Sequence, residues 1–575
     1  MKMRVIFQSF SRWSVFRNDD RLLLIIAGAV AGSVSGLAAV ALHHVLSLMF
    51  FFFSQYRDRA WGLLLPAGGA ALSSLFLTWI MKEEPDHGIP EVIYSVSRFG
   101  GFLRFRSSFS RLISSALTIG TGGSAGPEAP VVISGAAIGS NIASLLSFNE
   151  RQRVTLVGCG AAGAISAIFN APIAGMIFTM EIILGEWSLI NIVPIAISAV
   201  VGTEVSHFLR GNQAILSHGG FNVHSVDSLA AVGLALCTAF FSVALIRMLR
   251  GMHHASSALS APLFLKAAIG GAVVGFIGFY FPHVLNEGYF TVTQMIGGLF
   301  QAGMMAALVG VILKIVATSL TLGWGGSGGI FAPCLVIGSF SGIFFIRLLS
   351  FSFPSITWAE EGCYALLGMA GMVSGILQAP LTGIFLAVEI TGGYEVMLPL
   401  IVVSAFSTAI SRYFEPTSYY LKDLVERGAL LRPGTDSRVL SDLTIEELLE
   451  TDCIRITKSM LLRDLIPLIQ SSHRNYFPVE DGKTGEFVGM VHLDDLRPYL
   501  FNRFMYDTVI VEQILNAHVK TAEISESLST VLSIMDREGL YSMPVVREKR
   551  FAGMISKATI LDQYRKELMV QTPDS

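Results

Sequence analysis

The chain has 575 residues, of which 52% are hydrophobic and only 14% are charged. With a mean hydropathy of +0.60, this composition excludes a soluble globular protein and indicates a multi-pass membrane protein. The formal net charge of −3, without a basic face interleaved with aromatic residues, argues against nucleic-acid binding. The five cysteines are scattered and lack ligand spacing, so we expect neither a disulfide framework nor a metal site.

The N-terminal segment 1–21 has an excess of Lys and Arg over Asp, and the positive-inside rule places it in the cytoplasm. The apolar run that follows, residues 22–53, is too long for a signal peptide and is expected to remain as the first membrane helix. Further apolar runs of unequal length extend to residue 413, and several are too short to span a bilayer alone. We therefore expect an integral protein of the cell inner membrane with both termini in the cytoplasm.

A repeated Gly-rich segment lies between these apolar runs. Residues 117–135, LTIGTGGSAGPEAPVVISG, occur again at 320–338 as LTLGWGGSGGIFAPCLVIG, at a constant offset of 203 residues. So much Gly followed by Pro interrupts a helix, and irregular backbone in a bilayer is tolerated only inside the protein or beside a wet cavity. Matched breaks in two halves indicate a transporter site where helix N-termini face an anion. We expect the helices to restart near Pro130 and Pro333; the alternative is two packing kinks.

The duplication continues beyond the breaks. Residues 160–182 match residues 368–390 at an offset of 208, so Glu181 falls opposite Glu389. Ionisable groups are costly in a membrane span and usually face the protein interior, where they pair or serve a pathway. Matched acids in both halves are therefore candidates for function.

Two basic residues, Arg111 and Lys314, also occupy matched positions, each shortly before its Gly-rich break. An interhelical ion pair or a snorkelling base is the alternative to a functional role for each. The aspartates before residue 410 are few and are expected outside the apolar runs. This argues against an intramembrane aspartyl protease and against a cation pore lined by acidic rings.

After a polar connector, the tail has ordinary charge density and a repeat of its own. Each copy combines helices with short β-branched runs in a βαββα pattern, with a leading helix before it. The sequence thus predicts the following divisions: segment 1–21, a membrane domain at 22–428 with repeats at about 22–215 and 225–428, a linker at 429–444, and modules at 445–506 and 507–568.

The membrane half resembles the CLC family of chloride channels and chloride/proton antiporters over about residues 20–425, and the tail resembles a tandem CBS pair. The motifs that carry the resemblance are the family's G(K/R)EGP at Gly126-Pro127-Glu128-Ala129-Pro130, GxFxP at Gly329-Ile330-Phe331-Ala332-Pro333, GSGIP at Asp86-His87-Gly88-Ile89-Pro90 and a terminal tyrosine at Tyr420. The resemblance implies an all-α, inverted-repeat membrane domain followed by α/β CBS domains. It also implies a homodimer in the lipid bilayer that moves chloride and similar anions, without enzymatic activity or a required cofactor.

By this resemblance Glu128 is a gating glutamate, whose carboxylate occupies an anion position and leaves it on protonation. The physical logic agrees, because a carboxylate at a helix N-terminus is held by the same N–H groups and dipole that hold an anion. The anion-binding residues that the resemblance implies are His87, Gly126, Gly329, Ile330, Phe331 and Tyr420. Three residues depart from the family pattern: Pro127 replaces a basic residue, Ala129 a glycine, and His87 a serine.

A further departure concerns protons. The family's antiporters have two acids where this chain has Glu181 and Ile182, and the second acid relays protons from the cytoplasm. Isoleucine cannot carry a proton, so the sequence favours chloride transport that is uncoupled or weakly coupled to protons and is gated by protonation of Glu128. Chloride/proton antiport, with water or Glu181 replacing the relay, is the alternative. A membrane-anchored nucleotide sensor whose transport domain has decayed is the second alternative.

In CBS pairs the nucleotide-binding copy often has a Ser or Thr followed three residues later by an Asp that holds a ribose. Copy one has His492 and Asp495 at these positions, and copy two has Ser556 and Thr559. Each copy keeps half of the pattern. An adenine nucleotide is therefore a candidate ligand of the pair, and the alternative is a ligand-free, dimerising tail.

Overall fold

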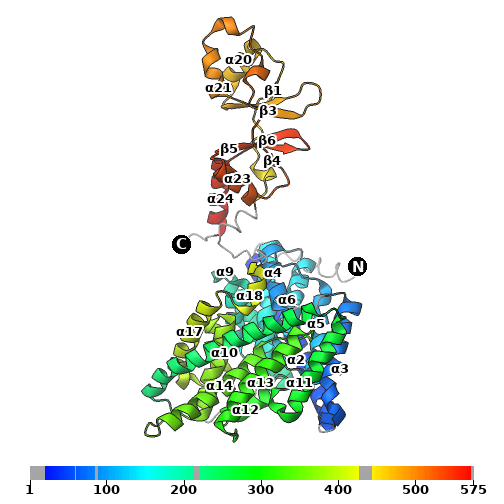
Figure 1. The fold of residues 1–575 in the computed structure, drawn as a ribbon, viewed down its shortest axis with the longest axis vertical. Helices are drawn as coiled ribbons and strands as arrows, with labels where there is room; N and C mark the ends of the chain where they lie inside the picture. The colour runs from blue at the N-terminus through cyan, green and yellow to red at the C-terminus, as the bar shows by residue number, and fades with distance from the viewer. Residues whose placement is uncertain (1–19, 58–59, 84–87, 212–219, 427–442, 572–575) are drawn as a thin grey trace. The chain divides into compact units, whose positions relative to one another are not determined.

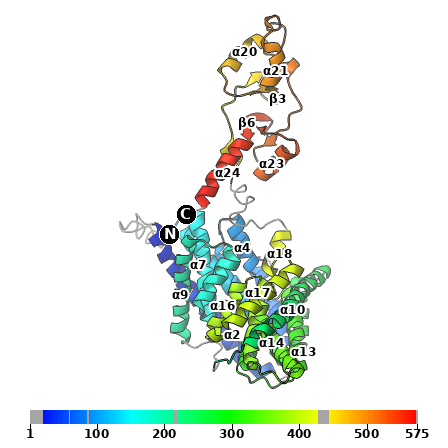
Figure 2. The ribbon, with the colours of Figure 1, turned by 90° about the vertical axis from the view of Figure 1, so that its left-hand side faces the viewer.

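A computed structural model describes residues 20–57, 60–83, 88–211, 220–426 and 443–571. It divides into two compact units, a membrane unit at Met1–Leu430 and a tail unit at Leu431–Ser575 (Figures 1 and 2). Most of the predicted cytoplasmic segment 1–21, most of the predicted linker 429–444 and the candidate anion ligand His87 lie outside the described residues.

The membrane unit is built from helices, as its apolar runs predict. In the first half these are α2 (Asp20–Arg57), η1 (Ala60–Leu64), α3 (Leu65–Leu75), η2 (Phe76–Met81), α4 (Ile89–Arg98), η3 (Phe105–Ser108), α5 (Ser110–Gly120), α6 (Glu128–Leu145), α7 (Glu150–Phe169), α8 (Pro172–Phe178), η4 (Thr179–Leu184) and α9 (Leu189–Arg210). In the second half they are α10 (Ser225–Ala258), α11 (Leu263–Tyr280), η5 (Pro282–Val284), α12 (Tyr289–Ile296), α13 (Met304–Gly323), α14 (Phe331–Ser352), α15 (Glu361–Leu377), α16 (Pro380–Thr391), η6 (Tyr394–Val396), α17 (Met397–Phe414) and α18 (Tyr419–Glu426).

The two halves correspond helix by helix. Helices α5 and α13 end at equivalent glycines, and α6 and α14 begin at equivalent residues after matched breaks. The packing repeats as well, because α6 lies on α7 as α14 lies on α15, and α2 contacts α9 as α10 contacts α17. The internal repeat in the sequence is therefore a repeat of structure.

The helices after the breaks begin two residues earlier than the prolines suggested. Helix α6 starts at Glu128 and α14 at Phe331, so Pro130 and Pro333 occupy the third helical position. Pro is tolerated there because the first-turn N–H groups of a helix have no acceptor within the helix. The break is consequently made by the glycines before each helix, while the prolines lie inside its first turn.

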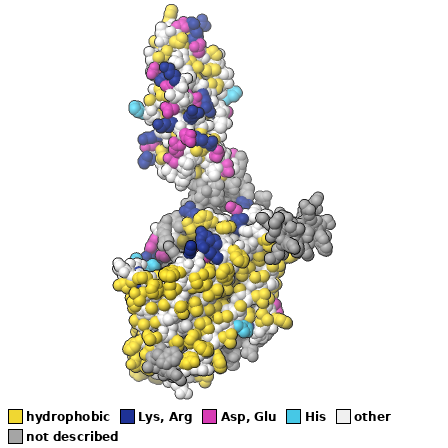
Figure 3. Space-filling model, turned by 90° about the vertical axis from the view of Figure 1, so that its right-hand side faces the viewer, with side chains coloured by type: hydrophobic (Ala, Val, Ile, Leu, Met, Phe, Trp, Pro, Cys, Tyr) yellow, Lys and Arg dark blue, Asp and Glu magenta, His cyan; other side chains and the backbone are white. Residues whose placement is uncertain are grey.

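The surface of the membrane unit is strongly apolar. Figure 3 shows hydrophobic side chains over most of its visible face, with few charged groups among them. Within the described residues, nine helices are long and apolar enough to cross a bilayer. The expectation that the aspartates lie outside the apolar segments is wrong for Asp227, which is fully buried in the first turn of α10 and accepts a hydrogen bond from the Tyr364 hydroxyl at 2.7 Å.

The tail unit contains two small sheets with the predicted βαββα order. Copy one has β1 (Ile456–Thr457), α20 (Leu462–Ser471), β2 (Tyr476–Glu480), β3 (Phe487–His492) and α21 (Leu493–Leu500). Copy two has α22 (Val511–Ile514), β4 (Ala522–Glu523), α23 (Leu528–Arg537), β5 (Ser542–Arg547), β6 (Arg550–Ser556) and α24 (Lys557–Gln571). In each sheet the first strand is parallel to the second, and the second is antiparallel to the third. The leading helix predicted for copy one is only a short turn, η7 (Glu446–Leu448).

The segments that lead into the two copies are exchanged. Leu443, just before copy one, and Ile445 and Leu448, at its start, pack into the core of copy two. Val509 and Val511, at the start of copy two, pack into the core of copy one. Each copy is therefore completed by residues that the sequence assigns to the other, and side chains from the leading segment lie at the junction between the copies.

Candidate functional site

The two Gly-rich breaks meet in the interior of the membrane unit. Gly126 N donates to Gly329 O at 2.7 Å, and Gly329 N donates to Gly126 O at 2.7 Å. This antiparallel pairing joins equivalent residues of the two copies. Two equivalent segments that run in opposite directions are what an inverted repeat requires.

Side chains of the helices before the breaks hold these segments in place. Ser124 N donates to Thr321 Oγ1 at 3.1 Å, and at the equivalent positions Ser327 N donates to Thr118 Oγ1 at 3.1 Å. All four residues are buried. The irregular backbone is thus supplied with buried hydrogen-bond partners, as non-helical backbone at membrane depth must be.

Glu128 lies at the point where the two breaks meet. It is the first residue of α6 and is fully buried. Its carboxylate accepts a hydrogen bond from Ala332 N in the first turn of α14, at 3.4 Å, and another from the Tyr289 hydroxyl of α12. The carboxylate therefore occupies a position at two helix N-termini, where an anion is also stabilised.

The Tyr420 hydroxyl is a second polar group of this region. Tyr420 is 1% exposed, and its Oη is buried without a hydrogen-bond partner in the described part of the chain. It lies within electrostatic range of Glu128 and of Cys334 in the first turn of α14. Because buried hydroxyls are normally hydrogen-bonded, this one is a donor available to an anion.

The remaining candidate ligands surround the same position. Ile330 is the N-cap of α14 and Phe331 is its first residue. Both are buried, and the Phe331 ring lies 5.5 Å from that of Phe169. A Cβ on Gly88, the residue after His87, would lie 3.4 Å from Ala129 O, which places the start of α4 against the first turn of α6. The structure thus brings Gly126, Gly329, Ile330, Phe331 and Tyr420 together around Glu128.

Tyr289 was not identified from the sequence. It bonds to Glu128 but lies outside every repeated or family motif, at the start of α12. Its ring also contacts Phe169, with ring centroids 6.3 Å apart. The internal repeat offers a weak indication of Tyr289, because this residue begins α12, and α12 is the counterpart of α4, whose start carries the GSGIP-like segment.

The two acids matched between the halves act as reciprocal helix caps. Glu181, in η4, accepts hydrogen bonds from Leu381 N at 3.3 Å and Thr382 N at 2.8 Å, at the start of α16. Glu389, in α16, accepts hydrogen bonds from Ile173 N at 3.0 Å and Ala174 N at 2.6 Å, at the start of α8. Each carboxylate satisfies orphan N–H groups of the other repeat. Beside Glu181, Ile182 is 9% exposed and belongs to the apolar core.

The two matched bases have different surroundings. Arg111 is buried and forms ion pairs with Glu83 at 3.8 Å and Glu91 at 3.7 Å. Lys314 is fully buried, and its Nζ donates to the carbonyl oxygens of Val284 and Asn286 at 3.0 and 2.9 Å. Arg111 thus takes part in the interhelical ion pairing given as the alternative, whereas Lys314 holds the loop before α12.

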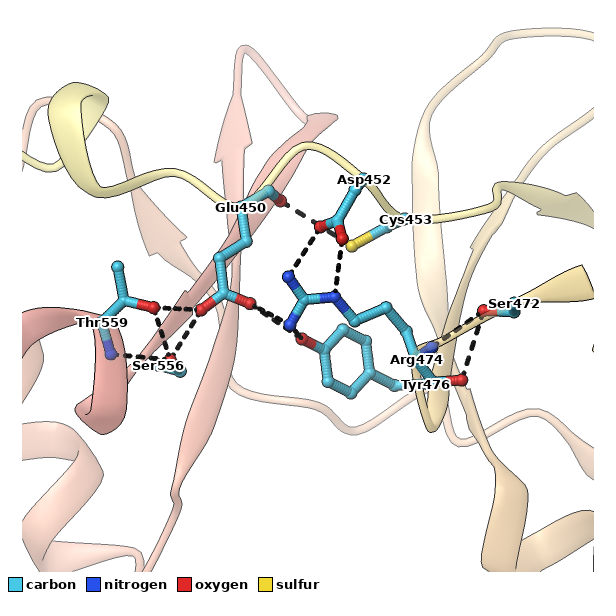
Figure 4. A network of polar contacts seen from close by, with 8 residues as sticks. All are labelled: Glu450, Asp452, Cys453, Ser472, Arg474, Tyr476, Ser556 and Thr559. Carbon is cyan, nitrogen blue, oxygen red and sulfur yellow. Dashed lines mark hydrogen bonds and ion pairs between the residues drawn. The ribbon is translucent and has the colours of Figure 1, made fainter.

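The tail residues proposed for a nucleotide lie in two different environments. His492 and Asp495 are exposed, and Asp495 accepts only a capping hydrogen bond from His492 N, at 3.3 Å, among the bonds described for its side chain. Ser556 and Thr559 instead both donate to the carboxylate of Glu450 (Figure 4). No sequence motif includes Glu450, because this residue lies in the exchanged leading segment.

Glu450 joins the two copies of the tail repeat. Besides Ser556, its carboxylate accepts a hydrogen bond from the Tyr476 hydroxyl at 3.1 Å and pairs with Arg474 at 2.7 Å (Figure 4). Burial opposes its ionisation, but the hydrogen bonds from Ser556 and Thr559 and the charge of Arg474 hold the pKa of Glu450 below its usual range. Burial and the Glu450 charge raise the pKa of Tyr476 to about 12. The carboxylate therefore remains ionised at neutral pH.

Among the described residues there is no cluster of His, Cys, Asp or Glu that could hold a metal ion. The site consists instead of helix N-termini, a buried carboxylate and a buried hydroxyl where the broken helices of an inverted repeat meet. This arrangement defines an anion-transporting membrane protein.

Comparisons with known proteins support this class of protein. Residues 68–412 match the family described as voltage gated chloride channel, and residues 445–502 and 511–566 each match the CBS domain. The chain belongs to the voltage-gated chloride channel family and carries two C-terminal CBS domains.

Curated relatives are similar to the membrane unit. The chain is 28% identical over 407 residues to a putative chloride channel protein ClcB-like from Ralstonia nicotianae, covering 67% of this chain and 93% of that protein. It is 27% identical over 421 residues to the H(+)/Cl(−) exchange transporter ClcA of Yersinia pestis bv. Antiqua, covering 69% and 86% of the two chains. The crystal structure of a slow cyanobacterial Cl−/H+ antiporter has the same fold, with a TM-score of 0.66, 23% identity and coverage of 72% of this chain and 98% of that chain.

Proposed function

We propose that this protein moves chloride across the membrane through the junction of the two breaks, and that Glu128 gates the pathway. The observation that carries the proposal is the position of the Glu128 carboxylate, which is buried at two helix N-termini. It lies near the Tyr420 hydroxyl, which has no hydrogen-bond partner among the described residues. Ionised, the carboxylate competes with chloride for the same N–H groups. Protonated, it loses that attraction and leaves the position to the anion.

For coupling to protons, we propose that transport is uncoupled or weakly coupled. Ile182 offers no proton acceptor, and the neighbouring Glu181 carboxylate is engaged by the first turn of α16. Protons then reach Glu128 from one side of the membrane without crossing it. The second candidate is chloride/proton antiport, which is favoured by the similarity to a protein named as an H(+)/Cl(−) exchange transporter. In that case water replaces the missing relay acid.

We further propose a homodimer of the cell inner membrane, with one pathway in each subunit and cytoplasmic termini. The CBS pair is a regulatory module for which an adenine nucleotide is the candidate ligand. Calorimetric titration of the full-length protein with ATP, ADP and AMP tests this point. Heat of binding with any of them supports the nucleotide, and no heat with all three supports a ligand-free scaffold.

Chloride efflux from proteoliposomes tests the gate. We expect efflux from the wild-type protein to rise as the pH falls, because acid protonates Glu128. The Glu128→Gln variant resembles the protonated gate and should carry chloride with no pH dependence. An unchanged pH profile in this variant would assign gating to another group. Absence of chloride efflux at every pH in the wild-type protein would instead support a membrane-anchored sensor.

A further inference from the structure

A cavity of about 590 Å³ opens on the surface of the membrane unit, and the residues of the candidate anion site do not line it. Its wall contains residues from the ends of η2 and α10 and from the start of α11. Three of the apolar spans end or begin at this wall, namely Gly62–Met81, Ser225–Ala258 and Leu263–Tyr280. The cavity therefore lies at a boundary of the apolar layer, at the level where lipid headgroups are found.

The charged side chains of the wall are mainly basic. Lys82 directly follows η2, Lys266 lies in the first turn of α11, and His253 lies near the end of α10. The ammonium groups of Lys82 and Lys266 form no ion pair or hydrogen bond with any residue that the structure describes. Two cations without a protein partner in one cavity favour the binding of an anion.

One acid, Glu83, also lines the cavity, but its charge is already balanced. Its carboxylate pairs with Arg106 at 3.2 Å and with Arg111 at 3.8 Å, and it accepts a hydrogen bond from the Ser110 hydroxyl at 2.8 Å. It is therefore not needed by the two lysines, nor does it neutralise them. The wall also offers the hydroxyl of Ser256, a residue that is only 5% exposed and whose side chain has no hydrogen bond among those described.

The surface beside the cavity is apolar. Helix α3, which continues into η2, packs along α11 (Figure 1). On α11, Leu265, Ile269 and Val273 follow one another at a helical spacing and are 44%, 40% and 42% exposed. On η2, Trp79 and Ile80 are 73% and 67% exposed, and Trp is typical of the boundary between membrane and water. A lipid whose headgroup enters the cavity can thus place its acyl chains on this face.

We propose that the cavity binds the phosphate headgroup of an anionic membrane lipid, with Lys82 and Lys266 as its charged ligands and Ser256 as a hydroxyl donor. Basic pockets between membrane helices suit such headgroups. A free phosphate ion has the same chemistry for the two ammonium groups, but it makes no contact with the apolar face. The lipid therefore binds more tightly than the free ion.

The position of the cavity connects it with the second Gly-rich break. Gly323 and Gly325, which lead into that break, form part of the wall. A Cβ on Gly325 would lie 3.0 Å from Leu263 Cδ1, so the break packs directly on the start of α11. The bound headgroup therefore lies against the backbone that precedes α14.

The melting temperature of the purified full-length protein in detergent, titrated with phosphatidylglycerol, tests the proposal. We expect this lipid to raise the melting temperature, because a ligand that binds only the folded state stabilises it. Phosphatidylcholine with the same acyl chains has no net charge, and inorganic phosphate has no acyl chain. Both should raise the melting temperature much less at equal concentration. An equal rise with either of them, or no rise with phosphatidylglycerol, would overturn the anionic lipid as the ligand.

Paired substitutions assign the site. Lys82→Gln/Lys266→Gln should weaken the apparent affinity for phosphatidylglycerol roughly thirtyfold, as expected for the loss of two lysines near an anionic lipid. Lys82→Arg/Lys266→Arg keeps both charges and should retain most of the affinity. Arg104→Gln/Arg151→Gln removes two exposed charges of the membrane unit outside the cavity and should leave the affinity unchanged. Equal weakening by the two Gln pairs would indicate unspecific charge attraction and refute the site.

Discussion

Gly126 and Gly329, equivalent residues of the two repeats, exchange a pair of 2.7 Å backbone hydrogen bonds in the interior of the membrane unit. This close approach requires that both residues lack a side chain. A Cβ on Gly329 would lie 2.8 Å from Ala129 Cβ and 3.1 Å from Ala129 N, while a Cβ on Gly126 would lie 2.0 Å from Glu128 Oε2. The glycines therefore bring the breaks together and also leave the space that the Glu128 carboxylate occupies.

The Gly126→Ala substitution should displace the Glu128 carboxylate, which is the movable end of a flexible side chain. The displaced carboxylate no longer accepts the hydrogen bonds from Ala332 N and the Tyr289 hydroxyl. We therefore expect chloride efflux at neutral pH to rise roughly tenfold and to depend less on pH. Efflux from proteoliposomes at several pH values measures this. The control is Gly251→Ala in α10, where an added Cβ meets nothing within 4 Å. Lower efflux with an unchanged pH profile in Gly126→Ala would contradict the displacement.

The reciprocal caps of Glu181 and Glu389 lead to a paired prediction. Each carboxylate accepts at least two hydrogen bonds from a helix start in the other repeat. Replacing either by Gln removes the charge, so we expect each variant to lose about 1–3 kcal/mol of stability, measured as a lower melting temperature of the purified protein. Neither variant should change proton movement. If Glu181→Gln alone altered proton movement, Glu181 would have a relay function that its counterpart lacks.

The sequence predicts the two breaks, because a duplicated Gly-rich segment marks both of them, and the resemblance to the CLC family points to Glu128 in the first one. It does not predict the bond between Tyr289 and Glu128, or that between Glu450 and Ser556. These contacts join residues 161 and 106 positions apart in the chain, and in each pair one partner lies outside any motif. The role of Glu450 is harder still to predict, because its segment packs with the other copy of the tail repeat. Only the tertiary arrangement brings such residues together.

The junction at Glu450 predicts a pH-dependent stability of the tail unit. Its pKa in the folded protein is held below the usual carboxyl range, so the ionised form stabilises the fold. This stabilisation is present above the unfolded-state pKa, about 4.3, and is lost as the pH falls through the folded-state pKa. We expect the calorimetric unfolding transition of the tail unit in the full-length protein to shift to lower temperature below about pH 4.

The Glu450→Gln variant tests the origin of that shift. It should lower the stability of the tail unit by about 1–3 kcal/mol at neutral pH. In the variant, the part of the acid-induced decrease in stability that comes from protonation of Glu450 should be absent. Glu446→Gln is the matched control, because Glu446 is 70% exposed and pairs only with Arg547 among the partners described for it. An exposed pair of this kind contributes little to stability. Equal effects of the two substitutions would show that the junction has no special role.

The final prediction concerns Ile182 and the coupling of chloride to protons. A proton that crosses the membrane needs a chain of titratable groups or water, and a buried β-branched hydrocarbon supplies neither. Ile182 is 9% exposed and lies in the apolar core, so we expect a chloride gradient to drive little uphill proton movement in proteoliposomes. Ile182→Glu should restore some of it, although burying the acid costs about 2.5–3.5 kcal/mol. Ile182→Gln, which is polar but cannot be ionised, is the matched control and should not restore it. Strong proton pumping by the unmodified protein would establish antiport through water instead.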